Sequence, residues 1–177
     1  MPANIFSLAQ IVGYAAYVLT IVAFWQKRDK KMLLLNAVSA ATWVVHYGLL
    51  GAWAGSITEI LVTVRSILSA YMTDKRHKHL AAGFFLIGFV IVGVFTYHYF
   101  YDVFVVAACM LGTVSMVYWD GIKMRWGMLV TLILWLLYTL FAGSIGGVMS
   151  SVTIVTTQII TLLRMYRDKK LAEVAAA

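Results

Sequence analysis

Residues 142–145 of this chain read Ala-Gly-Ser-Ile, and residues 54–57 read the same four letters. Each copy follows a hydrophobic stretch that carries a tryptophan, Trp43 before the first copy and Trp135 before the second. Each copy also precedes a second hydrophobic stretch that is dotted with serine and threonine and ends in a cluster of basic residues. Two apolar stretches around a small-residue turn predict a pair of membrane helices, and the second occurrence predicts that this pair is duplicated.

Composition predicts that the solvent of this chain is the lipid bilayer. Of its 177 residues, 63% are hydrophobic and only 12% are charged, a balance that a soluble domain of this size does not show. The one cysteine, Cys109, lies inside an apolar stretch, which excludes a disulfide or a thiolate metal site within one chain. The chain has one proline, Pro2, and few polar linkers, so we expect no separate aqueous domain.

A bilayer needs about 20 mostly apolar residues per helix, and on that basis the sequence predicts seven transmembrane helices. Helices are expected because lipid-exposed backbone must satisfy its own hydrogen bonds, and the alternation typical of a membrane barrel is absent. The first span has no preceding Lys or Arg and no small-residue cleavage site after it, so we do not expect a cleaved signal peptide. The predicted spans are 7–25, 32–50, 54–72, 80–97, 103–119, 126–141 and 144–163.

Basic residues indicate the orientation. Thirteen of the 14 Lys and Arg residues fall in the connections after the first, third and fifth predicted spans or after the seventh. The positive-inside rule makes that side cytoplasmic, which predicts an N-terminus outside and a C-terminus inside. The net charge of +7 comes from basic residues placed on the cytoplasmic side of the membrane. It therefore does not indicate a basic surface for nucleic acid, and we expect no nucleic-acid partner.

The seven spans divide as three, one and three. The second and third spans match the sixth and seventh through the repeated tetrapeptide, and the fourth span is left over. Two units of the same topology need an odd linker helix between them, so we expect two parallel three-helix bundles joined by a linker. The predicted divisions are residues 1–78, 79–98, 99–170 and a cytoplasmic tail, 171–177. Chance similarity between apolar segments remains the alternative explanation.

The second repeat resembles the bacterial inner-membrane YgjV family in its run from Phe141 to Gly147, in Trp135 and in the Arg164 that ends the last span. The basic first cytoplasmic loop and Arg65 fit this family too. The resemblance covers most of the chain and implies a multi-pass protein of the bacterial inner membrane. More weakly, the 3+1+3 plan resembles the SWEET, PQ-loop and PnuC transporters, which implies a central substrate path. This chain lacks their Pro-Gln pair and has no intramembrane proline, so it does not predict a proline-hinged motion.

Arg65 is the deepest charge in the predicted spans. A charge at such depth costs about 2.5–3.5 kcal/mol on insertion scales, so it should face the bundle interior or a wet cavity. It is a candidate for holding an anionic or zwitterionic solute. The alternative is a structural arginine that binds exposed carbonyl groups or Asp120.

His46 and Glu59 form a second candidate pair. Folding the second and third spans back on each other at about residue 52 places these two side chains at similar depth near the outer side. A His–carboxylate pair inside a membrane could carry protons. A structural hydrogen bond that does not titrate is the alternative.

The two tryptophans occupy matching places in the repeats and are candidates for one substrate site between the bundles. The hairpin geometry brings Trp43 level with Thr63 and Trp135 level with Ser151, and Gln158 lies on the same helix face as Ser151. Flat rings beside polar side chains suit a small amphipathic solute. Tight helix packing by small and hydroxyl residues is the alternative for the serine and threonine positions.

No motif of the sequence predicts an enzyme, a cofactor or a metal site, because neither a phosphate-binding loop nor metal-ligand spacing is present. The sequence therefore predicts an alternating-access carrier of a small polar solute, and a homo-oligomer is compatible with this prediction. The alternative is a non-transporting membrane receptor or an assembly subunit of the same fold.

Overall fold

The computed structural model describes residues 7–49, 53–97, 99–141 and 145–175, and this part of the chain consists of seven α-helices without a strand. The expectation of an all-helical chain is confirmed. The helices are α1 (Leu8–Phe24), α2 (Asp29–Leu49), α3 (Trp53–Tyr71), α4 (Lys75–Thr96), α5 (Asp102–Tyr118), α6 (Gly121–Phe141) and α7 (Ile145–Ala175).

Four helices are longer than the apolar stretches that predicted them, and three of these differ by a full turn or more. Helix α4 begins at Lys75 instead of residue 80, α6 begins at Gly121 instead of residue 126, and α7 continues to Ala175 instead of ending at 163. The prediction counted apolar residues, whereas a helix continues into charged sequence wherever its backbone hydrogen bonds can still form. In each case the additional turns are basic.

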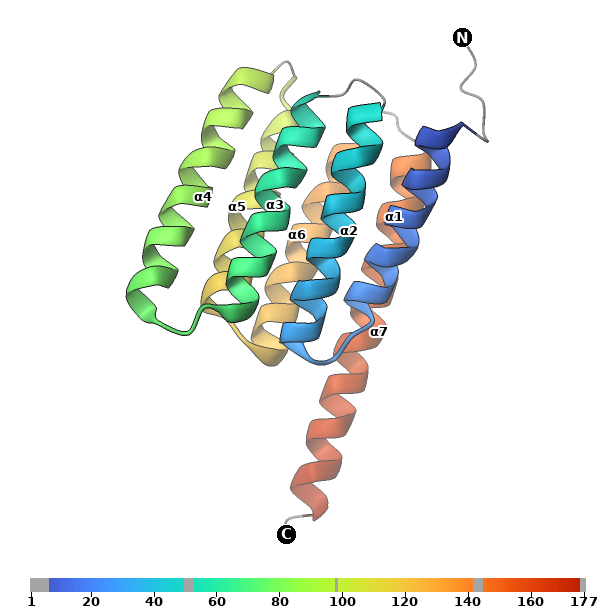
Figure 1. Cartoon of the computed structure of the whole chain (residues 1–177). Helices are drawn as coiled ribbons and strands as arrows, with labels where there is room; N and C mark the ends of the chain where they lie inside the picture. The colour runs from blue at the N-terminus through green and yellow to red at the C-terminus, as the bar shows by residue number, and fades with distance from the viewer. Residues whose placement is uncertain (1–6, 50–52, 98, 142–144, 176–177) are drawn as a thin grey trace.

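The helices form two layers of antiparallel neighbours (Figure 1). Helix α2 packs between α1 and α3 in one layer, and α6 packs between α5 and α7 in the other. Across the layers, α1 contacts α7 and α3 contacts α5, while α4 packs against both α3 and α5 at the edge of the bundle. The connections 25–28, 72–74 and 119–120 lie at one end, which we call the basic end, and α7 extends beyond the bundle there (Figure 1).

The outside of the bundle differs from the surface of a water-soluble protein. Large apolar side chains cover the outside, for example Phe84, Ile87 and Val94 along α4, each more than 60% exposed. Polar side chains are enclosed together with the apolar core, and those with no exposed surface include Ser66, Thr113, Arg125, Gln158 and Thr161. This distribution is the one expected when the surrounding solvent is hydrocarbon.

Among the described residues, three helices are long and apolar enough to cross a membrane, namely α2 over Asp29–Leu49, α4 over Arg76–Phe95 and α6 over Gly121–Tyr138. Helices α1 and α5 are apolar but have 17 residues each. Helices α3 and α7 carry more polar sequence, and their buried polar side chains are sheltered by neighbouring helices. Length and hydropathy therefore support a membrane protein, while the count of seven crossings stays a prediction.

Glycine sets the spacing between α1 and α2. A Cβ atom at Gly13 would lie 2.7 Å from two atoms of the His46 ring. The ring in turn lies within hydrogen-bond distance of the backbone of α1, with 2.8 Å between Nδ1 of His46 and the carbonyl oxygen of Ala9. The missing side chain at Gly13 thus creates the place that the His46 ring fills.

Candidate functional site

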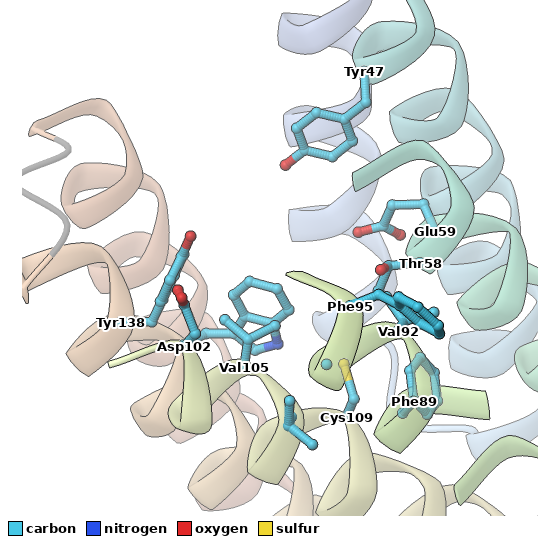
Figure 2. Close-up of a pocket in the computed structure, with 13 residues that line it drawn as sticks. Tyr47, Thr58, Glu59, Phe89, Val92, Phe95, Asp102, Val105, Cys109 and Tyr138 are labelled. Atoms are coloured by element: carbon cyan, nitrogen blue, oxygen red, sulfur yellow. The ribbon is translucent and has the colours of Figure 1, made fainter. Parts of the chain in front are cut away.

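A cavity of about 470 Å³ lies at the end of the bundle opposite the basic end (Figure 2). This volume falls within the range of small-molecule binding sites. Residues of α2, α3, α4, α5 and α6 line it, so both predicted repeats and the predicted linker helix contribute. The lining residues are Tyr47, Thr58, Glu59, Phe89, Val92, Gly93, Phe95, Asp102, Val105, Val106, Cys109, Trp135 and Tyr138.

Two carboxylates lie in the wall of this cavity, Glu59 from α3 and Asp102 from α5. Figure 2 shows the Glu59 carboxylate turned toward the space between α3 and α6. Among the described residues, none forms a hydrogen bond or ion pair with this carboxylate. Asp102 is the first residue of α5, and its Oδ2 accepts a hydrogen bond of 2.8 Å from the backbone N–H of Tyr99, just before the helix.

Aromatic rings form much of the remaining wall. Trp135 and Tyr138, one turn apart on α6, meet edge to face at 6.0 Å between ring centroids. Across the cavity, the hydroxyl groups of Tyr47 and Tyr138 both point toward the enclosed space (Figure 2). Phe89 and Phe95 of α4 complete the aromatic lining. Rings of this kind offer flat apolar surface, and their faces attract cations.

Arg65 lies directly beneath the cavity and is 4% exposed. Its Nη1 donates to the carbonyl oxygen of Cys109 at 3.1 Å and to Oγ1 of Thr113 at 3.0 Å, both on α5. Its guanidinium carbon lies 5.5 Å from the centre of the Phe89 ring. Phe89 and Cys109, which Arg65 contacts, both line the cavity, whereas Arg65 is not among the described lining residues. The geometry matches the alternative of a structural arginine that binds backbone carbonyl groups.

His46 does not meet Glu59, which corrects the expectation that these two side chains pair. The His46 ring faces α1 and lies 2.8 Å from the carbonyl oxygen of Ala9, whereas Glu59 faces the cavity. Hairpin geometry predicts the depth of a residue but not its face, and α2 has a neighbour on each side. The two residues therefore turn to opposite sides of the α2–α3 pair.

The two tryptophans do not line the same cavity. Trp135 lines it, whereas the indole N–H of Trp43 donates to Oγ1 of Thr20 on α1 at 3.2 Å. Trp43 stacks on Tyr47, which does reach the cavity, with 5.6 Å between ring centroids. The cavity therefore does not lie between Trp43 and Trp135 as expected. It lies closer to α3, α4 and α5, because the Trp43 side chain packs in the contact between α1 and α2.

The other three predicted site residues lie away from the cavity. The Thr63 hydroxyl donates to the carbonyl oxygen of Glu59 within its own helix, at 2.8 Å. Ser151 is partly buried in α7. Gln158 is fully buried, and its Nε2 donates to the backbone carbonyl of Arg125 at 2.8 Å.

A second polar cluster joins the two layers at the basic end. Asp29, at the start of α2, accepts a hydrogen bond from the backbone N–H of Gly121 at the start of α6. Its other oxygen lies 3.3 Å from Nη2 of Arg125, whose side chain has no exposed surface. Gly121 adopts φ +55°, a conformation that favours glycine. Among the described residues, none forms a hydrogen bond with the buried Nε and Nη1 of Arg125 or with the buried Oε1 of Gln158.

Sequence reasoning named Gln158 as a candidate binding residue but did not single out Asp29, Arg125 or the acid Asp102. In the sequence, Asp29 and Arg125 look like ordinary charged residues of cytoplasmic connections. Asp102 directly follows a run of aromatic residues that is typical of the membrane interface, so it did not stand out. A signal for Asp29 was available, since an acidic residue in the first turn of a helix is typical of a capping role. Within the described part of the chain, no group of three His, Cys, Asp or Glu residues is placed to hold a metal ion.

Comparison with known proteins agrees with the helical membrane architecture. Residues 7–169 match the family Imp-YgjV, described as a bacterial inner membrane protein. The chain is 24% identical over 163 residues to the inner membrane protein YgjV of Escherichia coli strain K12, an alignment that covers 92% of this chain and 87% of that protein. No solved structure matches this chain significantly. The chain therefore belongs to the Imp-YgjV family of bacterial inner membrane proteins.

Proposed function

We propose that this protein is an alternating-access carrier that moves a small polar solute across the inner membrane. The observation that carries the proposal is the cavity of about 470 Å³ inside a helical bundle of an inner membrane protein. A cavity lined by apolar surface with a few convergent polar groups is the usual form of a small-molecule site.

The proposed topology has seven spans, with the N-terminus outside and the C-terminus inside. It is supported by seven helices that alternate in direction and by the basic residues gathered at one end of the bundle (Figure 1). The contacts of α1 with α7 and of α3 with α5 are those expected if residues 1–78 and 99–170 are two parallel repeats related by an axis along the membrane normal. In this topology the cavity lies on the outer side.

The polar cluster at the basic end suits the role of an inner gate. Asp29 and Arg125 join α2 to α6, one helix from each proposed repeat, below the cavity. Alternating access would require these two helices to separate at the basic end while the cavity closes at the other end. Partly unsatisfied donors of Arg125 make this joint less stable than a fully bonded one, which favours opening.

Uptake into proteoliposomes that contain the purified protein tests the proposal. A panel of labelled amines, amino acids, carboxylates and sugars should include at least one solute that enters faster than into protein-free vesicles. Asp29→Asn should alter this rate, whereas Asp120→Asn, an exposed acid at the same end, should not. Binding of a solute with no uptake in sealed vesicles would overturn the carrier and favour the alternative of a membrane receptor.

A further inference from the structure

We propose that the cavity binds a small organic cation, a solute that carries an ammonium group, with Glu59 as its counter-ion. This inference deepens the proposed carrier function and rests on it for the passage of the solute. It departs from the sequence-based expectation of an anionic or zwitterionic solute held by Arg65.

The first argument is the charge of the lining. Glu59 and Asp102 both line the cavity, and the described lining residues include no Lys, Arg or His. Arg65 lies under Phe89 and Cys109, with Nη1 already donating to the carbonyl of Cys109 and to Thr113. When the charge of Arg65 is counted against the two carboxylates, one negative charge is left for the solute to balance. An anion would add a third negative charge to a largely apolar space, which is strongly unfavourable.

The second argument is the shape of the wall around Glu59. Rings of Tyr47, Trp135 and Tyr138 line the same space, and Phe89 and Phe95 line its α4 side. An ammonium group gains from the face of an aromatic ring, most of all from tryptophan, and aromatic cages are a common way to hold methylated ammonium ions. An anion gains no electrostatic stabilisation from a ring face, because the face is the negative part of the ring's quadrupole.

The third argument separates the two acids. Asp102 accepts the backbone N–H of Tyr99 and lies in the first turn of α5, where the positive end of the helix dipole offsets its charge. Glu59 lies in the second turn of α3, and none of the described residues forms a hydrogen bond or ion pair with its carboxylate. Glu59 is therefore the acid whose charge the solute would neutralise, while Asp102 contributes at longer range.

Four solutes of nearly equal shape test the inference: choline, glycine betaine, 3,3-dimethylbutanol and 3,3-dimethylbutanoate. They present a trimethylammonium or tert-butyl group and differ mainly in charge, which is positive, zwitterionic, neutral and negative, respectively. Isothermal titration calorimetry on the detergent-purified protein should give the tightest binding for choline, at least tenfold tighter than for the neutral alcohol, and no binding of the carboxylate. Carboxylate binding as tight as that of choline would overturn the inference, and tightest binding of glycine betaine would reassign the site to zwitterions.

Two variants link that preference to the residues. Glu59→Gln should weaken choline binding at least tenfold and leave the neutral alcohol unchanged, whereas Glu173→Gln, an acid on the exposed end of α7, should change neither. Trp135→Leu keeps apolar volume but removes the ring face, so it should weaken choline binding more than that of the alcohol. Equal losses for both ligands in either variant would indicate altered packing and count against the inference, and circular dichroism should confirm that both variants stay folded.

Failure of this inference is distinguishable from failure of the proposed function. If vesicles take up another solute and Glu59→Gln has no effect on that uptake, the carrier stands and the cation site is wrong. If choline binds through Glu59 in detergent but no member of the panel crosses sealed vesicles, the cation site stands and the carrier is wrong.

Discussion

Arg65 on α3 and Cys109 on α5 are joined across the two layers by a hydrogen bond of 3.1 Å from Nη1 to the backbone carbonyl oxygen. Cys109 lines the cavity, and its backbone carbonyl accepts the hydrogen bond from the charged Arg65 side chain. Thr113, whose hydroxyl donates to the same carbonyl at 2.7 Å, accepts a second bond from Nη1. The floor of the cavity is therefore fixed by a side chain that does not enter it.

This geometry predicts a structural phenotype for Arg65. Replacement by Gln should lower the thermal unfolding temperature in detergent, because loss of hydrogen bonds to buried groups costs about 1–3 kcal/mol. Arg65→Lys should keep part of the stability, since one donor can still reach a carbonyl. Arg76→Gln, an exposed arginine at the start of α4, is the matched control and should unfold like the parent protein. An unchanged unfolding temperature for Arg65→Gln together with lost solute binding would instead support a direct binding role.

Asp29 should be critical to the joint between α2 and α6. Asp29→Asn leaves the buried guanidinium of Arg125 without its charge partner, and breaking a buried pair in this way typically costs about 3–5 kcal/mol. Thermal unfolding should show the loss. The double variant Asp29→Asn with Arg125→Met should recover part of it, because the uncompensated charge is then removed. Simple addition of the two single effects would argue against this coupling.

Gly13 and His46 offer a test of packing with an internal control. Gly13→Ala would place a Cβ atom 2.7 Å from the His46 ring, so we expect a destabilisation of about 1–3 kcal/mol. Gly83→Ala should cost nothing comparable, since no heavy atom lies within 4 Å of its added Cβ. His46→Ala should relieve the effect of Gly13→Ala in the double variant. Equal unfolding temperatures for Gly13→Ala and Gly83→Ala would show that α1 and α2 are not packed as closely as described.

The ion pair between Lys27 and Asp168 should depend on pH. The hydrogen bond from Lys27 lowers the pKa of the Asp168 carboxyl below its ordinary value of 3.8, and the charges of Lys27, Arg167 and Arg164 lower that pKa further against the opposing effect of desolvation. A lowered pKa means that the contact is complete above the ordinary carboxyl pKa and is lost as the pH falls through the lowered one.

Spin labels at Arg28 and Leu171, in a variant with Cys109→Ser, can follow this contact. The distance distribution between the labels should be narrow at pH 7 and broaden as the solution is acidified below pH ~4, the usual range of an aspartate. Asp168→Asn should show the broad distribution at both pH values, and Glu173→Gln should behave like the parent. A distribution that stays narrow in Asp168→Asn would mean that another contact holds α7 in place.

Orientation can be measured with a single added cysteine in the same Cys109→Ser background. At Tyr99, 61% exposed at the end away from the basic residues, a cysteine should react with a membrane-impermeant maleimide in intact spheroplasts. One at Lys169 should react only after the membrane is opened, because the positive-inside rule places α7's basic end in the cytoplasm. The opposite pattern of labelling would reverse the proposed topology and move the cavity to the cytoplasmic side.

Helical architecture was predictable because it follows from composition and from the spacing of charges. Apolar stretches long enough for a bilayer, with basic residues in alternate connections, predicted seven helices, and each predicted stretch overlaps one of the seven helices in the described part of the chain. Helix ends were less predictable, since α7 continues through residues 164–175 on backbone hydrogen bonds that apolar counting does not detect. The division into two repeats and a linker stays a prediction.

Only part of the candidate site was predictable. Trp135, a predicted substrate-binding residue, and Glu59, a predicted proton carrier, both line the cavity, and the depth of Arg65 correctly indicated burial. The partner of His46 was not predictable, because a hairpin defines depth while side-chain direction depends on which neighbour each face meets. Asp29 and Arg125 were missed for a related reason: a charge near a helix end looks the same in sequence whether it faces water or a neighbouring helix.

Helix α7 extends beyond the rest of the bundle as one continuous helix (Figure 1). Its 31 residues correspond to a length of about 46 Å, well beyond the thickness of the hydrocarbon layer. Its inner part is anchored to α1 where Thr161 donates to the carbonyl oxygen of Phe24 at 3.0 Å. A stiff helix held at that point acts as a lever, so in the proposed carrier a small tilt of α7 would become a larger displacement of its tip. A fluorophore near Val174 would amplify motions that are too small to follow inside the membrane.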